Sequence, residues 1–219
     1  RAYGFDVTLL EREQAPGGRA RAVALGGVDA DPCATLCAAS DAATRELLEG
    51  IGQPDELETW NEGSLARAGA GDALHPLAAA RPDRRRRPEG VSWRESLRVV
   101  RLDRLAARYA PLLEGRAPER GEVLDDRSLA EWARLYFGEG VLSAWAAPLA
   151  CAATLDDAEE TSRLLFLRLY ARLRGSAPAS LRSGPAALAE ALSRRVTTRL
   201  GVALERVTAG AGGGFEGEG

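Results

Sequence analysis

The chain has 219 residues, of which 45% are hydrophobic and 28% are charged, as in an ordinary globular protein with room for a buried core. Its net charge of −3 argues against nucleic-acid binding, which normally needs a basic face. No apolar run approaches the roughly 18 residues that a membrane span requires. Three cysteines are too few for a disulfide framework, so we expect a cytoplasmic protein whose cysteines are small buried residues.

Both ends of the sequence resemble internal segments of a longer chain. The composition contains no methionine, and residues 1–7 read as the end of a helix, a glycine cap and the start of a strand. Residues 209–219 read as a glycine-rich turn that leads into another strand. We therefore expect this chain to be a piece of a longer protein.

The first part of the chain alternates between strands and glycine turns. The sequence predicts strands over 5–10, 19–25 and 28–32. The first is expected to be buried and to end on Glu11, and Gly26 with Gly27 predicts a hairpin between the other two. A helix is predicted over 40–52, and residues 53–91 are mixed, with short strands and a loop around the arginine-rich segment 81–88.

The second part is helical in pattern until its last residues. Helices are predicted over 92–115, 125–138, 139–155, 157–175 and 183–196, followed by a strand pair over 197–209. Pro111 is expected to bend or end the first of these helices, and Pro148 interrupts the third.

Three details of these helices can be compared with a structure. Acids are expected in the first turn of the helix over 157–175, where they suit the helix dipole. Ser183 is expected to cap the last helix. Trp132, Tyr136 and Trp145 are interpreted as core residues.

Glu11 and the residues that follow it are the candidate binding residues of the sequence. In dinucleotide-binding folds, a carboxylate at the end of a strand accepts hydrogen bonds from the adenosine ribose. Gly17 and Gly18 would let the backbone approach a pyrophosphate closely, and Arg19 adds a cation there. Each feature alone fits a surface acid or an ordinary turn, but together they favour a nucleotide site.

The same residues resemble a known family. The stretch VTLLEREQAPGGRARAV is similar to the second half of the cofactor-binding signature of the flavin amine oxidase superfamily. That group includes protoporphyrinogen oxidases, monoamine and polyamine oxidases, and carotenoid-type desaturases. Residues 26–36, with Asp31 as the usual acid, resemble the hairpin that follows, and 182–192 and 198–209 resemble the family's later helix and strand pair.

The resemblance implies an α/β fold, a partial Rossmann-like FAD-binding domain with an inserted, mostly helical substrate domain. The implied domains are residues 1–52 and 182–219 for FAD and 53–181 for the substrate. The implied FAD-binding residues are Glu11, Arg12, Gly17, Gly18, Arg19 and Leu204. The glycine fingerprint of the family would precede residue 1, and the resemblance assigns no catalytic residue here.

The implied function is FAD-dependent oxidation of a hydrophobic small molecule by hydride transfer to the flavin. The alternative is a non-catalytic binding protein that keeps the fold. Cys33 favours that alternative, because the family usually has a glycine there, where the backbone passes the flavin.

Two remaining features are given the simpler interpretation. The arginine-rich segment 81–88 is interpreted as a solvated loop, with peripheral contact to anionic lipid or phosphate as the alternative. The single histidine, His75, is expected in a loop, and we predict no metal site.

Overall fold

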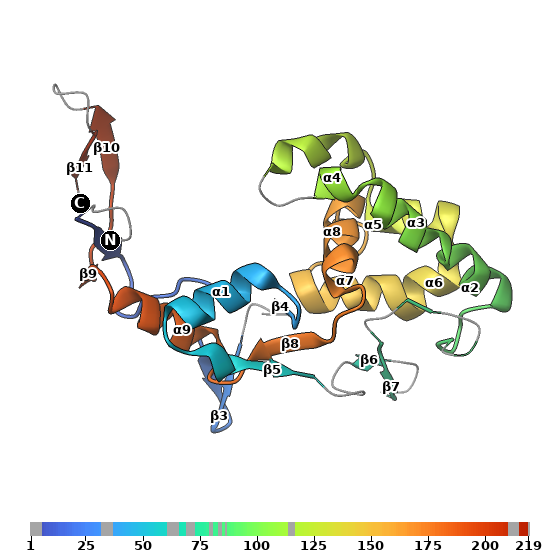
Figure 1. Ribbon diagram of the computed structural model, residues 1–219, viewed down its shortest axis with the longest axis horizontal. Helices are drawn as coiled ribbons and strands as arrows, with labels where there is room; N and C mark the ends of the chain where they lie inside the picture. The colour runs from blue at the N-terminus through green and yellow to red at the C-terminus, as the bar shows by residue number, and fades with distance from the viewer. Residues whose placement is uncertain are drawn as a thin grey trace. The chain divides into compact units, whose positions relative to one another are not determined.

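The computed structural model describes residues 6–31, 37–60, 66–68, 73–78, 81–82, 85, 87–113, 117–209 and 215–218. Cys33 and part of the arginine-rich segment lie outside the described residues. The chain divides into two compact units (Figure 1). Unit 1 comprises Arg1–Thr35, Glu46–Glu56 and Leu181–Gly219, and unit 2 comprises Leu36–Arg45 and Leu57–Ser180.

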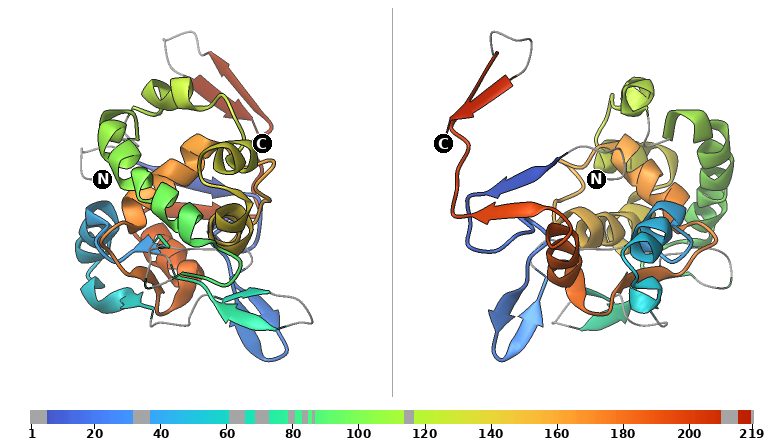
Figure 2. Two further views of the ribbon diagram at one scale, coloured as in Figure 1. Left: turned by 90° about the vertical axis from the view of Figure 1, so that its right-hand side faces the viewer. Right: turned by 60° about the vertical axis from the view of Figure 1, so that its left-hand side comes forward.

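Unit 1 contains a two-stranded parallel sheet. Strands β1 (Thr8–Glu11) and β9 (Thr197–Leu200) pair in register from Thr8 with Thr197 to Glu11 with Leu200, and they run side by side in Figure 2. The predicted strand that ends on Glu11 is therefore confirmed. The expectation that it is buried is wrong, because Leu9 and Leu10 are each 39% exposed.

The predicted strand pair over 197–209 is present as two strands that do not pair with each other. β9 pairs with β1, whereas β10 (Arg206–Ala209) pairs in antiparallel fashion with β11 (Phe215–Glu218). The reason is local: Gly201 follows β9 with a φ of +72°, which turns the chain out of the strand direction.

The predicted hairpin is confirmed, although its strands are shorter than expected. β2 (Val23–Leu25) and β3 (Val28–Ala30) pair around Gly26 and Gly27, whose φ values are +60° and +85°. Positive φ at both central residues defines the turn type whose twist matches a two-residue hairpin.

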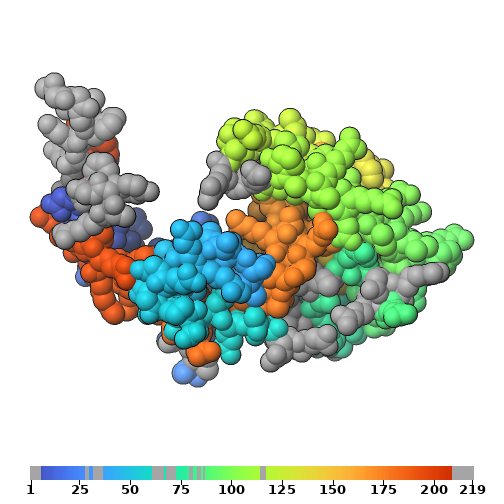
Figure 3. Space-filling view, viewed as in Figure 1, coloured from blue at the N-terminus to red at the C-terminus, as the bar shows by residue number. Residues whose placement is uncertain are grey.

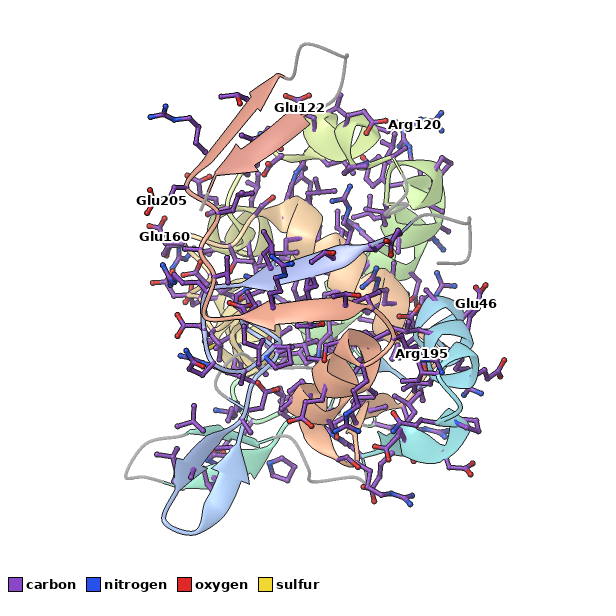
Figure 4. All side chains as sticks on the ribbon, turned by 90° about the vertical axis from the view of Figure 1, so that its left-hand side faces the viewer. Glu46, Arg120, Glu122, Glu160, Arg195 and Glu205 are labelled. Atoms are coloured by element: carbon purple, nitrogen blue, oxygen red, sulfur yellow. The ribbon has the colours of Figure 1, made fainter. Side chains whose placement is uncertain are left out.

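Short helices complete unit 1. They are α1 (Ala42–Gly50), which begins in unit 2, the 3₁₀ turn η1 (Pro54–Glu56), and α9 (Gly184–Ser193). Arg195, labelled in Figure 4, donates from Nη1 to the carbonyl of Gly50 at 2.8 Å and so joins the ends of α9 and α1. Ser183 makes no cap hydrogen bond, contrary to expectation, because its hydroxyl donates to Glu56 Oε1 at 3.0 Å.

Unit 2 contains short strands that the sequence located only loosely. They are β4 (Cys37–Ala38), β5 (Leu57–Thr59), β6 (Ala66–Ala68), β7 (Leu74–Pro76) and β8 (Pro178–Leu181). β8 lies between β4 and β5, and β6 pairs with β7. His75 lies in β7, so the loop predicted for it is wrong.

The helical part of unit 2 confirms the predicted helices but divides them further. The region 92–115 forms α2 (Trp93–Val99), α3 (Arg101–Arg108) and α4 (Ala110–Leu113). Pro111 lies in the first turn of α4, where the missing N–H has no helical partner. Then follow η3 (Pro118–Leu124), α5 (Leu129–Tyr136), α6 (Glu139–Val141), the π-helical turn η4 (Leu142–Ala146), α7 (Ala147–Thr154) and α8 (Arg163–Leu173).

The start of α8 corrects one prediction. The helix begins at Arg163 rather than near Asp157, and it has no acid in its first turn. Ser162 takes an extended conformation and its hydroxyl accepts from the N–H of Leu164 at 3.0 Å. The side chain of Asp157 instead accepts from the N–H groups of Glu159 and Glu160, which closes a turn before the helix.

Unit 2 holds the hydrophobic core. Trp132 packs edge-on against Phe137 with centroids 4.9 Å apart, and Trp145 packs edge-on against Phe166 at 5.6 Å. Both tryptophans are buried as predicted, but Tyr136 is 45% exposed, so its assignment to the core is wrong. Figure 3 shows α8 in orange against α3 and α4 in green, and side chains fill the space between them.

Candidate functional site

Glu11 lies where the parallel strands of unit 1 end. The ends of β1 and β9 meet at one edge because the strands are parallel and in register. The Glu11 side chain is half-buried, and its Oε1 accepts from the N–H of Glu13 at 2.9 Å. Ligands of open α/β sheets bind outside this carboxyl edge, and Oε2 is left to accept a further hydrogen bond.

The linker after β9 folds onto the same edge. The N–H of Val202 donates to the carbonyl of Glu11 at 3.0 Å, and the N–H of Gly201 donates to the carbonyl of Glu13 at 3.1 Å. A Cβ on Gly201 would lie 3.0 Å from the amide nitrogen of Gln14. Sequence reasoning missed Gly201; the signal for it was a glycine inside the predicted strand pair over 197–209.

The bend at 17–19 packs against α9. Gly17 has a φ of +125°, and a Cβ there would lie 2.4 Å from the carbonyl oxygen of Ala20 and 3.1 Å from Cβ of Ala189. The N–H of Ala20 donates to the carbonyl of Gly17 at 2.8 Å, which closes the turn. Gly17 is therefore required by the packing of the bend on α9.

Gly18 and Arg19 are the open part of this bend. Gly18 has a φ of +55°, and a Cβ there would meet nothing within 4 Å. Arg19 is exposed and makes no hydrogen bond or ion pair with any residue that the structure describes. Exposed backbone beside a free guanidinium is suited to an anionic ligand.

The other two predicted site residues are exposed. Arg12 lies directly after β1 and pairs with Glu13, with 3.1 Å between Nη2 and Oε1. Leu204 lies in the linker between β9 and β10, is 52% exposed, and is followed by Glu205, which Figure 4 labels. The hydrogen bonds thus bring Glu11 and the start of the 201–205 linker together, and separate contacts join the 17–19 bend to α9.

The described residues give no sign of a metal centre or a membrane span. No group of three or more His, Cys, Asp or Glu within the described ranges could hold a metal ion. Cys151 is exposed and Cys37 half-buried, so the expectation of buried cysteines is wrong for Cys151. No described helix combines the length and the apolar character needed to cross a bilayer.

A family model described as flavin containing amine oxidoreductase matches residues 1–216. The chain belongs to this family. The resemblance drawn from the Glu11 and Gly-Gly-Arg stretch is thereby confirmed at the level of the superfamily. No significant match was found among curated proteins.

Solved structures share the fold of this family member. Putrescine oxidase bound to putrescine superposes with a TM-score of 0.59 at 15% identity, over 94% of this chain and 48% of that chain. A protein assigned as a protoporphyrinogen oxidase, from Exiguobacterium sp. 255-15, superposes with a TM-score of 0.56 at 21% identity, over 94% of this chain and 49% of that chain. The family member described here thus spans about half the length of these proteins.

Glu11 at the carboxyl edge, and Gly18 with Arg19 in the bend, offer groups of the kind that bind parts of a flavin nucleotide. Glu11 offers an acceptor for hydroxyl groups, and Gly18 and Arg19 offer an uncrowded backbone and a cation for phosphate oxygens. These are the two functional groups that a dinucleotide presents beside its ring systems.

Proposed function

We propose that this chain is part of an FAD-dependent oxidoreductase that oxidises a hydrophobic small molecule by hydride transfer to the flavin. The observation that carries the proposal is the family match over residues 1–216, together with a carboxylate at the carboxyl end of a parallel strand. The two oxidases with the same fold support an oxidoreductase as the class of enzyme.

In this proposal Glu11 binds the adenosine ribose. Its Oε1 is held by the N–H of Glu13, which fixes the carboxylate and leaves Oε2 for a ribose hydroxyl. A hydrogen bond of this charge-assisted kind contributes about 1.5–3 kcal/mol. The linker 201–205, with Leu204, would lie along the adenine, since its backbone already rests on the end of β1.

The bend after β1 would contact the pyrophosphate. Gly17 sets the bend against α9, so that the N–H of Gly18 and the guanidinium of Arg19 are presented to solvent. Arg12, which directly follows Glu11 and pairs with Glu13, would be a second cation of the site. When bound, FAD would supply the redox chemistry, and these residues hold and orient it.

We further propose that unit 1 is the partial Rossmann-like part of an FAD-binding domain and that unit 2 is the inserted substrate domain. The parallel pair β1 and β9, with α9 directly before β9, supports the first assignment. The aromatic core of α5, η4 and α8 supports the second, because helices of this kind can line an apolar cavity. The domain limits 1–52, 53–181 and 182–219 remain predictions.

The proposal is tested by the visible absorption of the complete gene product, recorded as purified and after incubation with FAD. We expect the bands of oxidised flavin, and we expect Glu11→Ala to weaken FAD binding at least about 10-fold, which follows from the loss of a charge-assisted hydrogen bond. Glu46→Ala, an exposed glutamate of α1 labelled in Figure 4, is the matched control.

Two results would overturn the proposal. One is a protein that is colourless as purified and does not take up FAD. The other is a Glu11→Ala protein that binds FAD as tightly as the unaltered protein. The first result would favour the non-catalytic binding protein instead.

A further inference from the structure

One cavity has all its lining residues within unit 2, so it does not depend on the proposed flavin site. It has a volume of about 460 Å³ and is open to solvent. Its lining includes polar or charged residues from three parts of the chain: Arg67 and His75 of the β6–β7 hairpin, Glu89, and Ser143 of η4. The small residues Ala73, Gly90 and Ala144 complete the lining.

The helix that borders the cavity has an unusual turn at this point. Residues 142–146 form a π-helical turn inside the run from Glu139 to Thr154, and the N–H of Ala147 donates to the carbonyl of Leu142. The cause lies in Pro148, which has no N–H for the carbonyl of Ala144. Such turns occur often at functional sites, because they displace a side chain from the regular helical position.

Arg67 is incompletely paired beside the cavity. Its Nη2 donates to the carbonyl of Glu89 at 3.1 Å, which holds the guanidinium in place. Its Nε is buried and has no hydrogen-bond partner in the part of the chain that the structure describes. Its Nη1 has no hydrogen-bond partner among the described residues, so a carboxylate in the cavity would accept from Nη1 without displacing the bond to Glu89.

Glu89 and Ser143 can accept hydrogen bonds from a donor group of a ligand in the cavity. Glu89 Oε2 lies 3.6 Å from His75 Nδ1, and the Glu89 side chain is 80% exposed, so its carboxylate can accept a further hydrogen bond. Ser143 donates its hydroxyl hydrogen to the carbonyl of Glu139 at 2.9 Å, which leaves the hydroxyl oxygen as an acceptor.

The charges of the cavity select between classes of ligand. The guanidinium of Arg67 and the carboxylate of Glu89 carry opposite charges, so this lining is less suited to a phosphate dianion than a wholly basic one. Because a cation and an anion both line the cavity, it suits a ligand that carries an anionic group and a hydrogen-bond donor. We propose that this cavity binds a small carboxylate that carries a hydroxyl or amino donor next to the carboxylate group, with the carboxylate on Arg67 and the donor on Glu89.

The proposal is tested by NMR titration of the 219-residue chain with glycolate, glycine, acetate and inorganic phosphate. We expect saturable binding of glycolate or glycine, and the comparison of these two tells whether the donor is a hydroxyl or an amine. Acetate lacks the donor and phosphate has the wrong charge, so we expect each to bind at least about 5-fold more weakly, which corresponds to about one hydrogen bond.

Two variants locate the binding. Arg67→Gln should weaken binding at least 10-fold, whereas Arg120→Gln, an exposed arginine of η3 labelled in Figure 4, should leave it unchanged. Glu89→Gln, at an exposed side chain that does not threaten the fold, should remove the preference for glycolate or glycine over acetate.

The inference is wrong if neither glycolate nor glycine binds saturably to the folded chain. It is also wrong if Arg67→Gln and Arg120→Gln bind the ligand equally well, or if Glu89→Gln keeps the full preference over acetate. Tighter binding of phosphate than of glycolate would replace it with a phosphate site.

Discussion

At the scale of single residues, Asp103 is the centre of the main polar network of unit 2. Its Oδ1 accepts from the hydroxyl of Tyr170 at 2.5 Å, and its Oδ2 accepts from Arg81 Nε at 2.7 Å, while Arg174 lies 3.6 Å away. Burial alone would raise the pKa of Asp103, but these hydrogen bonds and charges outweigh it and lower the pKa below the ordinary value of 3.8. The network ties α3, α8 and the segment at Arg81 together.

We predict an acid-dependent loss of stability from this carboxylate. Because its folded-state pKa is lowered, its contribution is complete above about pH 3.8 and is lost as the pH falls through the folded-state pKa. Tyr170→Phe should cost about 1.5–3 kcal/mol at neutral pH and should reduce the loss of stability below pH 3.8. Urea unfolding at stepped pH measures both effects. Tyr109→Phe, on the neighbouring turn, is the control, and equal effects of the two variants would contradict the prediction.

Gly140 packs closely against Glu95 and the backbone of Gly90. Glu95 accepts from the N–H of Gly140 at 2.8 Å while it also caps α2 through Ser92. A Cβ on Gly140 would lie 2.3 Å from the carbonyl oxygen of Gly90, and that backbone cannot move aside cheaply. We expect Gly140→Ala to destabilise the protein by about 1–3 kcal/mol. Gly50→Ala should be neutral or slightly stabilising, since nothing lies within 4 Å of its Cβ position. Thermal unfolding compares the two variants.

At the scale of elements, the start of α8 depends on one hydroxyl. Ser162 caps the helix through the N–H of Leu164, so Ser162→Ala should cost about 1 kcal/mol. Ser193→Ala removes a hydroxyl that only bonds back to the carbonyl of Glu190 in α9, and it should change stability by less than about 0.5 kcal/mol. Denaturant midpoints distinguish these outcomes, and a Ser162→Ala protein as stable as the control would refute the assignment of the cap.

Some boundaries of helices and strands could be predicted from the sequence, and others could not. The hairpin at Gly26–Gly27 and the helix that became α1 follow from local turn and cap signals. The start of α8 was misplaced because Asp157 and Ser162 are both good cap residues, and only the hydrogen bonds of the folded chain choose between them. Likewise, nothing local to 197–209 shows that β9 pairs with β1, about 190 residues earlier.

At the scale of the whole molecule, the two units differ in how their cores are built. Unit 2 buries large aromatic and aliphatic side chains, including Trp145, Phe166 and Leu129. In unit 1 the parallel strands carry exposed apolar residues such as Leu9, Leu10 and Leu200. Parallel sheets are normally covered on both faces, so this pair has little packing to protect its hydrogen bonds.

We therefore predict that hydrogen exchange separates the units. Backbone amides of β1 and β9 should exchange much faster than those of α5 and α8, because local opening is easier where few apolar contacts must break. Mass spectrometry of peptides after exchange measures this directly. Equal protection of the two groups would show that the sheet of unit 1 is stabilised by packing that the described residues do not contain.

The sequence by itself determined the family, the strand that ends on Glu11, the glycine bend and most helices, because these depend on residue types at short spacing. Only the tertiary structure decided that β9 pairs with β1 and that Gly17 packs against α9. It also decided that the N–H groups of Gly201 and Val202 bond to the carbonyls of Glu13 and Glu11. These contacts join residues far apart in the chain, and a local pattern contains no information about which distant segment supplies the partner. The cavity lined by Arg67 and His75 was also decided by the tertiary structure, since its lining residues come from separate parts of the chain.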